Sequence, residues 1–311
     1  MLSVRFWGTR GSIPVPGQDT IFFGGNTSCL EIRADDRLMI VDLGTGVKPL
    51  GDWLMDNDFK KRPIDTDIFL THTHWDHIMG LPMFAPLFIS TTKLRIRGPV
   101  SYEEDTLESI IGAQLSYRFW PVRQSDLSAH IEYGQLKETT LDLGGGVKVI
   151  TKYLSHPILC LGYRFEYQGK SIVTAYDHEP FRNLFPSKPG DRNYDEDTAR
   201  EGDAAAREEN EKVINFFKNA DVLVHDTQYT EAEYQAGKKG WGHSSYERAI
   251  ENAEKAAVKH LVFFHHDPNR NDTALTQLEW DYRDQINRTY NTTGDNRLEL
   301  TMAREGLTIT A

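Results

Sequence analysis

The stretch Thr71-His72-Thr73-His74-Trp75-Asp76-His77 directly follows an apolar run, residues 68–70, that is typical of a buried β-strand. Residues two apart at a strand end face the same side, so His72 and His74 can point together into one site. The acid and the histidine that end the stretch come from the turn beyond and approach from another direction. Neutral imidazole and carboxylate suit zinc, manganese or iron, and no sulfur ligand is needed. The stretch therefore predicts a metal site.

Ligands of the same types recur downstream, each directly after an apolar run that predicts a strand. Open α/β sheets gather their binding groups at the carboxyl ends of strands, so we expect these residues to meet the first stretch. One more histidine, one acid and a final histidine would complete two metal sites. The candidates are His156, Asp177, and either His265 or His266.

Short alternating or apolar runs, cut by glycine-rich turns, predict a strand-rich first part, a mixed middle and a strand-rich end. The predicted strands are 2–7, 29–33, 38–41, 67–70, 94–97, 147–153, 161–167, 171–175, 221–225, 261–264, 298–300 and 307–309. The predicted helices are 102–113, 208–218 and 244–257. In the last helix, Ser244 and Glu247 form an S-x-x-E capping box.

Length and charge narrow the class of protein. The chain has 311 residues, of which 39% are hydrophobic, so it can bury a large core. Its 35 basic and 46 acidic residues give a net charge of −11. An acidic surface repels polyphosphate, so a small substrate is expected rather than a long nucleic acid.

Other features favour a cytoplasmic protein without a membrane partner, and they allow a homodimer. The two cysteines, Cys29 and Cys160, are too few for a disulfide framework, and we expect both to be buried thiols. The first residues do not resemble a signal peptide. No apolar stretch approaches the roughly 20 residues that span a bilayer.

The domain organisation is predicted to be simple. We interpret residues 1–311 as one domain with a charged insertion at about 179–212, which is rich in proline, glycine and acids. The insertion is interpreted as a solvated surface segment with a helical second half. The alternative is a mobile flap over the site, because long loops in compact domains are often functional.

The order of the candidate ligands resembles the metallo-β-lactamase superfamily. His72, His74, Asp76 and His77 match its H-x-H-x-D-H motif, and the later candidates follow in the expected order. The resemblance covers about residues 2–267. It implies an α/β fold of the four-layer αββα sandwich type, with metals at one edge between two sheets.

The resemblance also implies two divalent metal ions, with zinc expected and manganese or iron as alternatives. The first ion is assigned to His72, His74, His156 and Asp177. The second ion is assigned to Asp76, His77, Asp177 and His265. Asp177 would bridge the two ions, as a carboxylate with two oxygens can. His265 is preferred to His266 because it aligns with the last ligand of the family.

Further motifs resemble the ribonuclease Z branch of this superfamily. Residues 6–14, 24–28 and 42–46 resemble its glycine-rich opening. The run of residues 221–229 resembles its HEATF motif, with Asp226 in place of the glutamate, and Gly242-His243-Ser244-Ser245 resembles its HST motif. In that branch the HST histidine is thought to protonate the leaving oxygen. The resemblance thus implies two catalytic residues, His243 as general acid, oriented by Asp226, and Asp76 as the group that orients the nucleophile.

The chain also departs from ribonuclease Z. It lacks a glycine- and lysine-rich segment like the arm that grips transfer RNA, and residues 72–81 resemble smaller cyclic-nucleotide phosphodiesterases. We therefore expect a metal-dependent phosphodiesterase that acts on a small phosphodiester, a 3′,5′-cyclic nucleotide. The alternatives are a ribonuclease Z-like RNA 3′-processing endonuclease, a lactone or thioester hydrolase on the same fold, and a non-catalytic binding module. The complete ligand set argues against the binding module.

Overall fold

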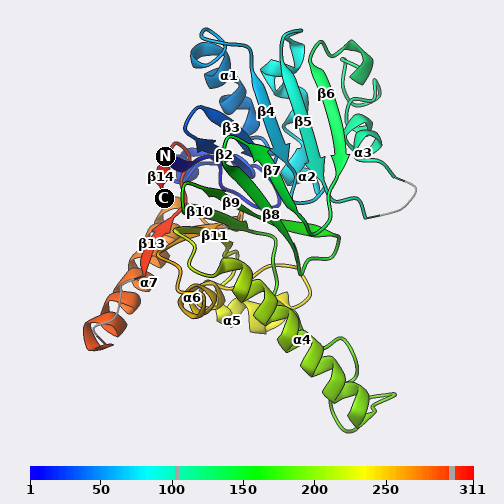
Figure 1. Ribbon diagram of the computed structural model, residues 1–311. Helices are drawn as coiled ribbons and strands as arrows, with labels where there is room; N and C mark the ends of the chain where they lie inside the picture. Colours follow the sequence, from blue (N-terminus) through cyan, green and yellow to red (C-terminus); the bar gives the residue numbers. More distant parts are fainter. Residues whose placement is uncertain (102–104, 294–297) are drawn as a thin grey trace.

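The computed structural model describes residues 1–101, 105–293 and 298–311, and within them the chain forms two seven-stranded mixed sheets (Figure 1). The first sheet has, in spatial order, β14 (Thr308–Thr310), β1 (Leu2–Gly8), β2 (Cys29–Ala34), β3 (Arg37–Val41), β4 (Asp65–Phe69), β5 (Lys93–Gly98) and β6 (His130–Gln135). The second has β13 (Glu299–Met302), β12 (His260–Phe264), β11 (Val222–Asp226), β10 (Lys170–Ala175), β9 (Cys160–Tyr167), β8 (Val147–Leu154) and β7 (Thr140–Gly144).

Helices cover the outer face of each sheet. They are α1 (Val47–Asn57), α2 (Trp75–Ile78), α3 (Leu107–Ala113), α4 (Glu196–Phe217), α5 (Glu231–Glu233), α6 (Tyr246–Lys255) and α7 (Asp272–Thr293). One apolar cluster packs α1, α2 and α3 on the first sheet, and another packs α4, α6 and α7 on the second. A third cluster lies between the sheets and joins side chains of β1–β4 to those of β8–β12. The predicted four-layer αββα sandwich is therefore confirmed.

The strand directions explain where a site can form. β3 to β6 run parallel in the first sheet, and β10 to β13 run parallel in the second. Parallel strands end at the same edge of a sheet, which is where binding groups gather in α/β folds. The final strand, β14, pairs with β1, so both ends of the chain belong to the first sheet. This closure supports our proposal that residues 1–311 fold as one domain.

Each predicted strand is present, with its ends shifted by at most a few residues, but two edge strands were missed. β6 and β7 have half-exposed side chains and contain or precede glycines, so their apolar alternation is weak. Among the helices, α1 was missed because it contains Pro49 and Gly51. Proline is tolerated in the first turn of a helix, and a Cβ on Gly51 would lie 3.0 Å from the Phe84 ring.

The other helices differ from the prediction in their limits. α2 is too short to show a periodic pattern, and α7 has few buried apolar residues. α4 begins at Glu196, well before the predicted 208, inside the charged stretch. The helix predicted at 102–113 falls partly outside the described residues. Within them, α3 begins at Leu107 and is capped by Thr106.

The predicted capping box at Ser244 is wrong by one residue. Ser245 is the N-cap of α6, and its hydroxyl accepts a hydrogen bond from the backbone N–H of Arg248. The Ser244 hydroxyl instead donates to the carbonyl oxygen of His178, next to a predicted metal ligand. Tertiary contact therefore decides which of two adjacent serines caps the helix.

The charged insertion is helical in its second part, as predicted. The end of α4 packs through Val213 and Phe217 against the second sheet, while its beginning and the loop before it extend away from the sandwich (Figure 1). The start of the insertion, at Glu179, reaches the edge where the predicted ligands lie. In the described part of the chain, no helix combines the length and apolarity that a membrane crossing needs.

Asp67, in the middle of β4, joins three strands through ion pairs. Its buried carboxylate is 3.0 Å from Arg37 of β3 and 2.9 Å from Arg95 of β5, and it also contacts Arg97. Burial alone would raise the pKa of Asp67, but its bonds to Arg95 and Arg97 lower it below the usual value. The ion pairs therefore stabilise the fold only while this carboxyl is ionised.

We expect Asp67→Asn to lower the free energy of unfolding by about 2–3 kcal/mol, because three arginines lose their charged partner in a mostly buried setting. The depressed pKa means that this contribution is complete above the unfolded-state value of about 4 and is lost as pH falls below it. Urea unfolding of both proteins should give a constant difference from pH 5 to 7 that shrinks in stronger acid. A difference that grows in acid would contradict this account.

Candidate metal centre

The first ligand stretch forms a loop and one helical turn at the end of β4. His72 lies just past the strand, His74 is the N-cap residue of α2, and Asp76 and His77 lie in that helix. His72 and His77 are completely buried, and Asp76 is nearly so. Gly80, just after this helix, packs against the backbone of Gly44. A Cβ on Gly80 would lie 2.1 Å from the carbonyl oxygen of Gly44, so the close approach requires glycine.

The second sheet supplies the remaining predicted ligands. His156 follows β8, Asp177 follows β10 and His265 follows β12, so each is at the carboxyl end of its strand. Asp177 and His265 are buried, His156 is partly buried, and all three contact the loop from the first sheet. The structure thus brings all seven predicted ligands to one edge of the sandwich.

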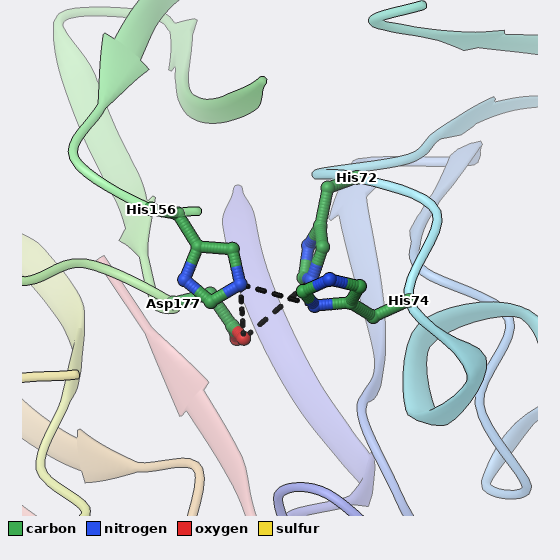
Figure 2. A group of neighbouring side chains, drawn as sticks. All are labelled: His72, His74, His156 and Asp177. Atoms are coloured by element: carbon green, nitrogen blue, oxygen red, sulfur yellow. Dashed lines mark hydrogen bonds and ion pairs between the residues drawn. The ribbon is translucent and has the colours of Figure 1, made fainter. Parts of the chain in front are cut away.

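The two oxygens of Asp177 face two different groups of histidines. Oδ2 is 3.6 Å from Nε2 of both His72 and His156, and His156 Nε2 is 3.1 Å from Nδ1 of His74 (Figure 2). These four residues converge within 4.8 Å of one another. The first predicted ligand group is therefore assembled around one carboxylate oxygen.

The other oxygen, Oδ1, is 3.2 Å from Nε2 of His77 and 3.1 Å from Nε2 of His265. Asp76 completes this second group, because its Oδ2 is 3.2 Å from the same nitrogen of each histidine. The arrangement is the one a bridging carboxylate requires, with one oxygen for each ion.

The chemistry of these groups fits bound cations. Nε2 of His72, Nε2 of His77 and Oδ1 of Asp177 are buried and have no hydrogen-bond partner among the described residues. Burial, with some repulsion from neighbouring imidazoles, lowers the pKa of His72 well below its usual value and that of His156 to about 4. Metals bind the neutral imidazole, so the surroundings of His72 and His156 favour the ligand form. At His77 burial would also lower the pKa, but the carboxylates of Asp177, Asp76 and Asp42 raise it well above its usual value. Buried polar atoms without partners carry a cost that coordination would remove.

The lowered pKa of Asp177 also fits the binding of cations. Burial would raise its pKa, but the neighbouring His265, His77 and His72 hold it well below the usual value. The carboxyl is therefore ionised throughout the neutral range, as a bridging ligand must be.

Two acceptors that the sequence reasoning missed orient the ligands. Asp42 Oδ2 is 2.7 Å from Nδ1 of His77, and Asp42 also accepts hydrogen bonds from the backbone and hydroxyl of Thr71. The carbonyl oxygen of Gly242 accepts a hydrogen bond from Nδ1 of His156 at 3.0 Å. Each contact places the proton on Nδ1 and leaves Nε2 free for a metal. Asp42 directly follows β3, and this position at a strand end is the sequence signal that could have identified it as a site residue.

The backbone is left-handed at several of these positions. Asp42, Asp177 and His265 have φ values of 61°, 56° and 62°. Non-glycine residues rarely adopt this conformation, and it concentrates at functional sites where surrounding contacts enforce it. The fold therefore holds these side chains in directions that an ordinary strand end would not give them.

The structure separates the two candidates for the last ligand. His265 points into the second group, and its ring packs so closely on Gly11 that a Cβ there would be 2.3 Å away. His266 turns away, and its Nε2 hydrogen-bonds the carbonyl oxygen of Ala303 at 2.8 Å. This geometry supports the preference for His265.

His243 lies beside both proposed ligand groups, and its ring nitrogen also falls within 4.8 Å of ligand atoms of Asp177, Asp226 and His265. Its ring centroid is 5.0 Å from that of His265 and 5.5 Å from that of His156. Its Nδ1 is 2.8 Å from Oδ2 of Asp226, the acid expected to orient it. Burial alone would lower the pKa of His243, but the negative charge of Asp226 and this hydrogen bond raise it to about 9.

The comparison with known proteins assigns the family. Residues 23–159 match the model of the metallo-beta-lactamase superfamily. A ribonuclease Z from Lactococcus lactis subsp. cremoris (strain MG1363) is 30% identical over 294 residues, which cover 85% of this chain and 88% of the relative. The chain belongs to the metallo-β-lactamase superfamily, in its ribonuclease Z-like branch.

Solved structures share this fold. Human tRNase Z, short form, has a TM-score of 0.59 and 20% identity, and covers 99% of this chain and 98% of its own. A diphosphatase from the PhnP family has a TM-score of 0.59 and 16% identity, over 100% and 98%. Similarity at this level shows the fold alone. As a member of the superfamily, the protein is a metal-dependent hydrolase.

Asp177→Ala should remove both metal ions, because each proposed ligand group loses an oxygen that no neighbour replaces. Elemental analysis of the purified variant should show close to no bound metal, against about two ions per chain in the wild type. His266→Gln is the matched control and should retain both ions, since His266 faces Ala303. Full metal content in Asp177→Ala would overturn the bridging assignment.

Proposed function

We propose that this protein is a phosphodiesterase that hydrolyses a small phosphodiester, and that its substrate is a 3′,5′-cyclic nucleotide. The pair formed by His243 and Asp226, placed beside the two ligand groups, carries this proposal. An alkoxide leaving group needs a proton donor, whereas the thiolate expelled from a thioester has less need of one.

The proposed metal ligands would hold two divalent ions that neutralise phosphoryl charge and supply a water activated at neutral pH. Asp76 would orient the attacking water, since its Oδ2 is already fixed by the backbone N–H of Ser12 at 2.7 Å. His243 would donate the proton from Nε2, because Nδ1 is engaged by Asp226. The raised pKa of His243 keeps it protonated at neutral pH, as a general acid must be.

An apolar groove of about 490 Å³ supports a nucleotide substrate. It is lined by Thr73 and Trp75, which flank the proposed ligand His74, and by side chains from α3 and Phe119 beyond it. Trp75 and Phe119 are each 75% exposed. Exposed aromatic rings beside a phosphate site suit the flat face of a nucleobase.

RNA 3′-end processing is the second candidate, because the similar Lactococcus protein is named ribonuclease Z. The net charge of −11 favours the small substrate, since a long RNA would be repelled by the acidic surface. The free, buried thiols of Cys29 and Cys160 support our proposal of a reducing, cytoplasmic location.

One assay separates the candidates. The purified protein, with zinc or manganese, is given bis(p-nitrophenyl) phosphate, cyclic AMP, a precursor transfer RNA and a lactone. We expect hydrolysis of the first two. Cleavage of the precursor RNA without cyclic AMP hydrolysis would favour the nuclease, and lactone hydrolysis alone would reject the phosphodiesterase.

His243→Ala should lower cyclic AMP turnover by about 10²–10⁴-fold while metal content stays unchanged, because the residue donates a proton and binds no metal. The loss should be smaller for bis(p-nitrophenyl) phosphate, whose leaving group needs little protonation. Steady-state rates on both substrates check this. Equal losses would mean that His243 positions the phosphate, and loss of metal would place it among the ligands.

Trp75→Ala should raise the KM for cyclic AMP about tenfold with little change in kcat, because one stacking partner of the base is lost. Trp280→Ala, which removes an exposed tryptophan on α7, is the control and should leave KM unchanged. An unchanged KM in both variants would show that the base does not occupy the groove.

A further inference from the structure

Glu179 is a buried carboxylate just beyond Asp177 and outside the proposed ligand groups. Only 4% of its surface is exposed. Its Oε1 accepts hydrogen bonds from the Tyr234 hydroxyl and the Gly240 backbone N–H, both at 2.7 Å. Its Oε2 accepts a hydrogen bond from the Gly242 backbone N–H at 3.0 Å. The carboxylate therefore fastens one short loop, residues 240–242.

This loop lies directly against a proposed metal ligand. The Gly242 carbonyl is the group that accepts the Nδ1 proton of His156 at 3.0 Å. Gly242 has a φ of 85°, and a Cβ on it would be 2.3 Å from that same nitrogen. Because backbone and ring are in contact, the position of the loop sets the orientation of the imidazole and the nitrogen that is left for a metal.

The same loop leads directly into the proposed general acid. His243 follows Gly242, and its Nδ1 is bonded to Asp226. The neighbour of Glu179, His178, donates its backbone N–H to Asp226 at 3.2 Å and accepts the Ser244 hydroxyl on its carbonyl oxygen. Residues 177–179 thus contact both proposed ligand groups and Asp226. They also contact Gly242 and Ser244, the two chain neighbours of His243.

We propose that Glu179 is a positioning residue that holds loop 240–242 so that His156 and His243 serve one substrate. Its effect on His243 rests on the proposed function, whereas its effect on His156 concerns metal binding alone. An aliphatic side chain could fill the space but would leave three donors without a partner. A carboxylate accepts all three, whereas the guanidinium of Arg182 is half-exposed and lies 3.9 Å from it.

Glu179→Gln tests this proposal, because the amide keeps the shape but presents an NH₂ group to a backbone donor. We expect dialysis against a chelator to strip metal from the variant at about 10–100-fold lower chelator concentration, as for other residues that orient metal ligands. Elemental analysis after dialysis gives this readout without an activity measurement. At saturating metal, turnover of diphenyl phosphate should fall about tenfold more than that of bis(p-nitrophenyl) phosphate, because protonation of the poorer leaving group is impaired.

Glu31→Gln is the matched control. Glu31, in β2, is 3% exposed and accepts hydrogen bonds from the Trp7 indole at 2.7 Å and from Arg33, both in the first sheet. We expect it to lower thermal stability but to leave metal retention and the ratio of the two substrates unchanged. If Glu179→Gln behaves like this control, the residue is merely structural and the proposal is overturned.

The two proposals can fail separately. If the wild type hydrolyses neither diester, the proposed function is wrong, and metal retention alone decides the role of Glu179. If Glu179→Gln does not fold, Glu179→Asp keeps the charge but shortens the reach. It should show the same pattern with smaller changes, and wild-type metal retention in that variant would count against the proposal.

Discussion

The carboxylate of Asp177 is the interaction on which the site depends. Its Oδ2 faces His72 and His156, and its Oδ1 faces His77 and His265, at distances of 3.1–3.6 Å. Each oxygen thus meets one histidine from the loop of the first sheet and one from the second sheet. A buried carboxyl would ordinarily be neutral, and the surrounding imidazoles keep this one ionised. Both sheets must therefore meet at this edge before either ligand group exists.

Successive shells of contacts keep this arrangement rigid. Asp42 fixes the ring of His77, Gly242 fixes that of His156, and Glu179 fixes the loop that carries Gly242. The left-handed backbone at Asp42 and Asp177 shows that the surrounding contacts overrule local preference. Such a site loses little free energy to reorganisation when charge develops in a substrate, which is how pre-organised polar groups accelerate hydrolysis.

We propose that His243 acts in proton transfer and not in metal binding. Its ring centroid lies 5.0 Å from that of His265 and 5.5 Å from that of His156. Its only side-chain hydrogen bond among the described residues is nevertheless to Asp226. Residues 177–179 link the two proposed functions, since they contact the proposed metal groups and the loop that leads to the proposed general acid. A change in one function is therefore expected to be felt in the other.

The sequence by itself predicted each interior strand, and its resemblance to the metallo-β-lactamase superfamily supplied the sandwich class and the seven proposed ligands. It could do so because alternation within a strand and the spacing H-x-H-x-D-H are local, and because strand ends of parallel sheets share an edge. Only the tertiary structure decided which oxygen of Asp177 faces which histidines, that His266 turns to Ala303, that Ser245 caps α6, and that Glu179 holds the loop of His243. These contacts join segments far apart in the chain. Their partners are fixed by how the two sheets pack, which no local pattern records.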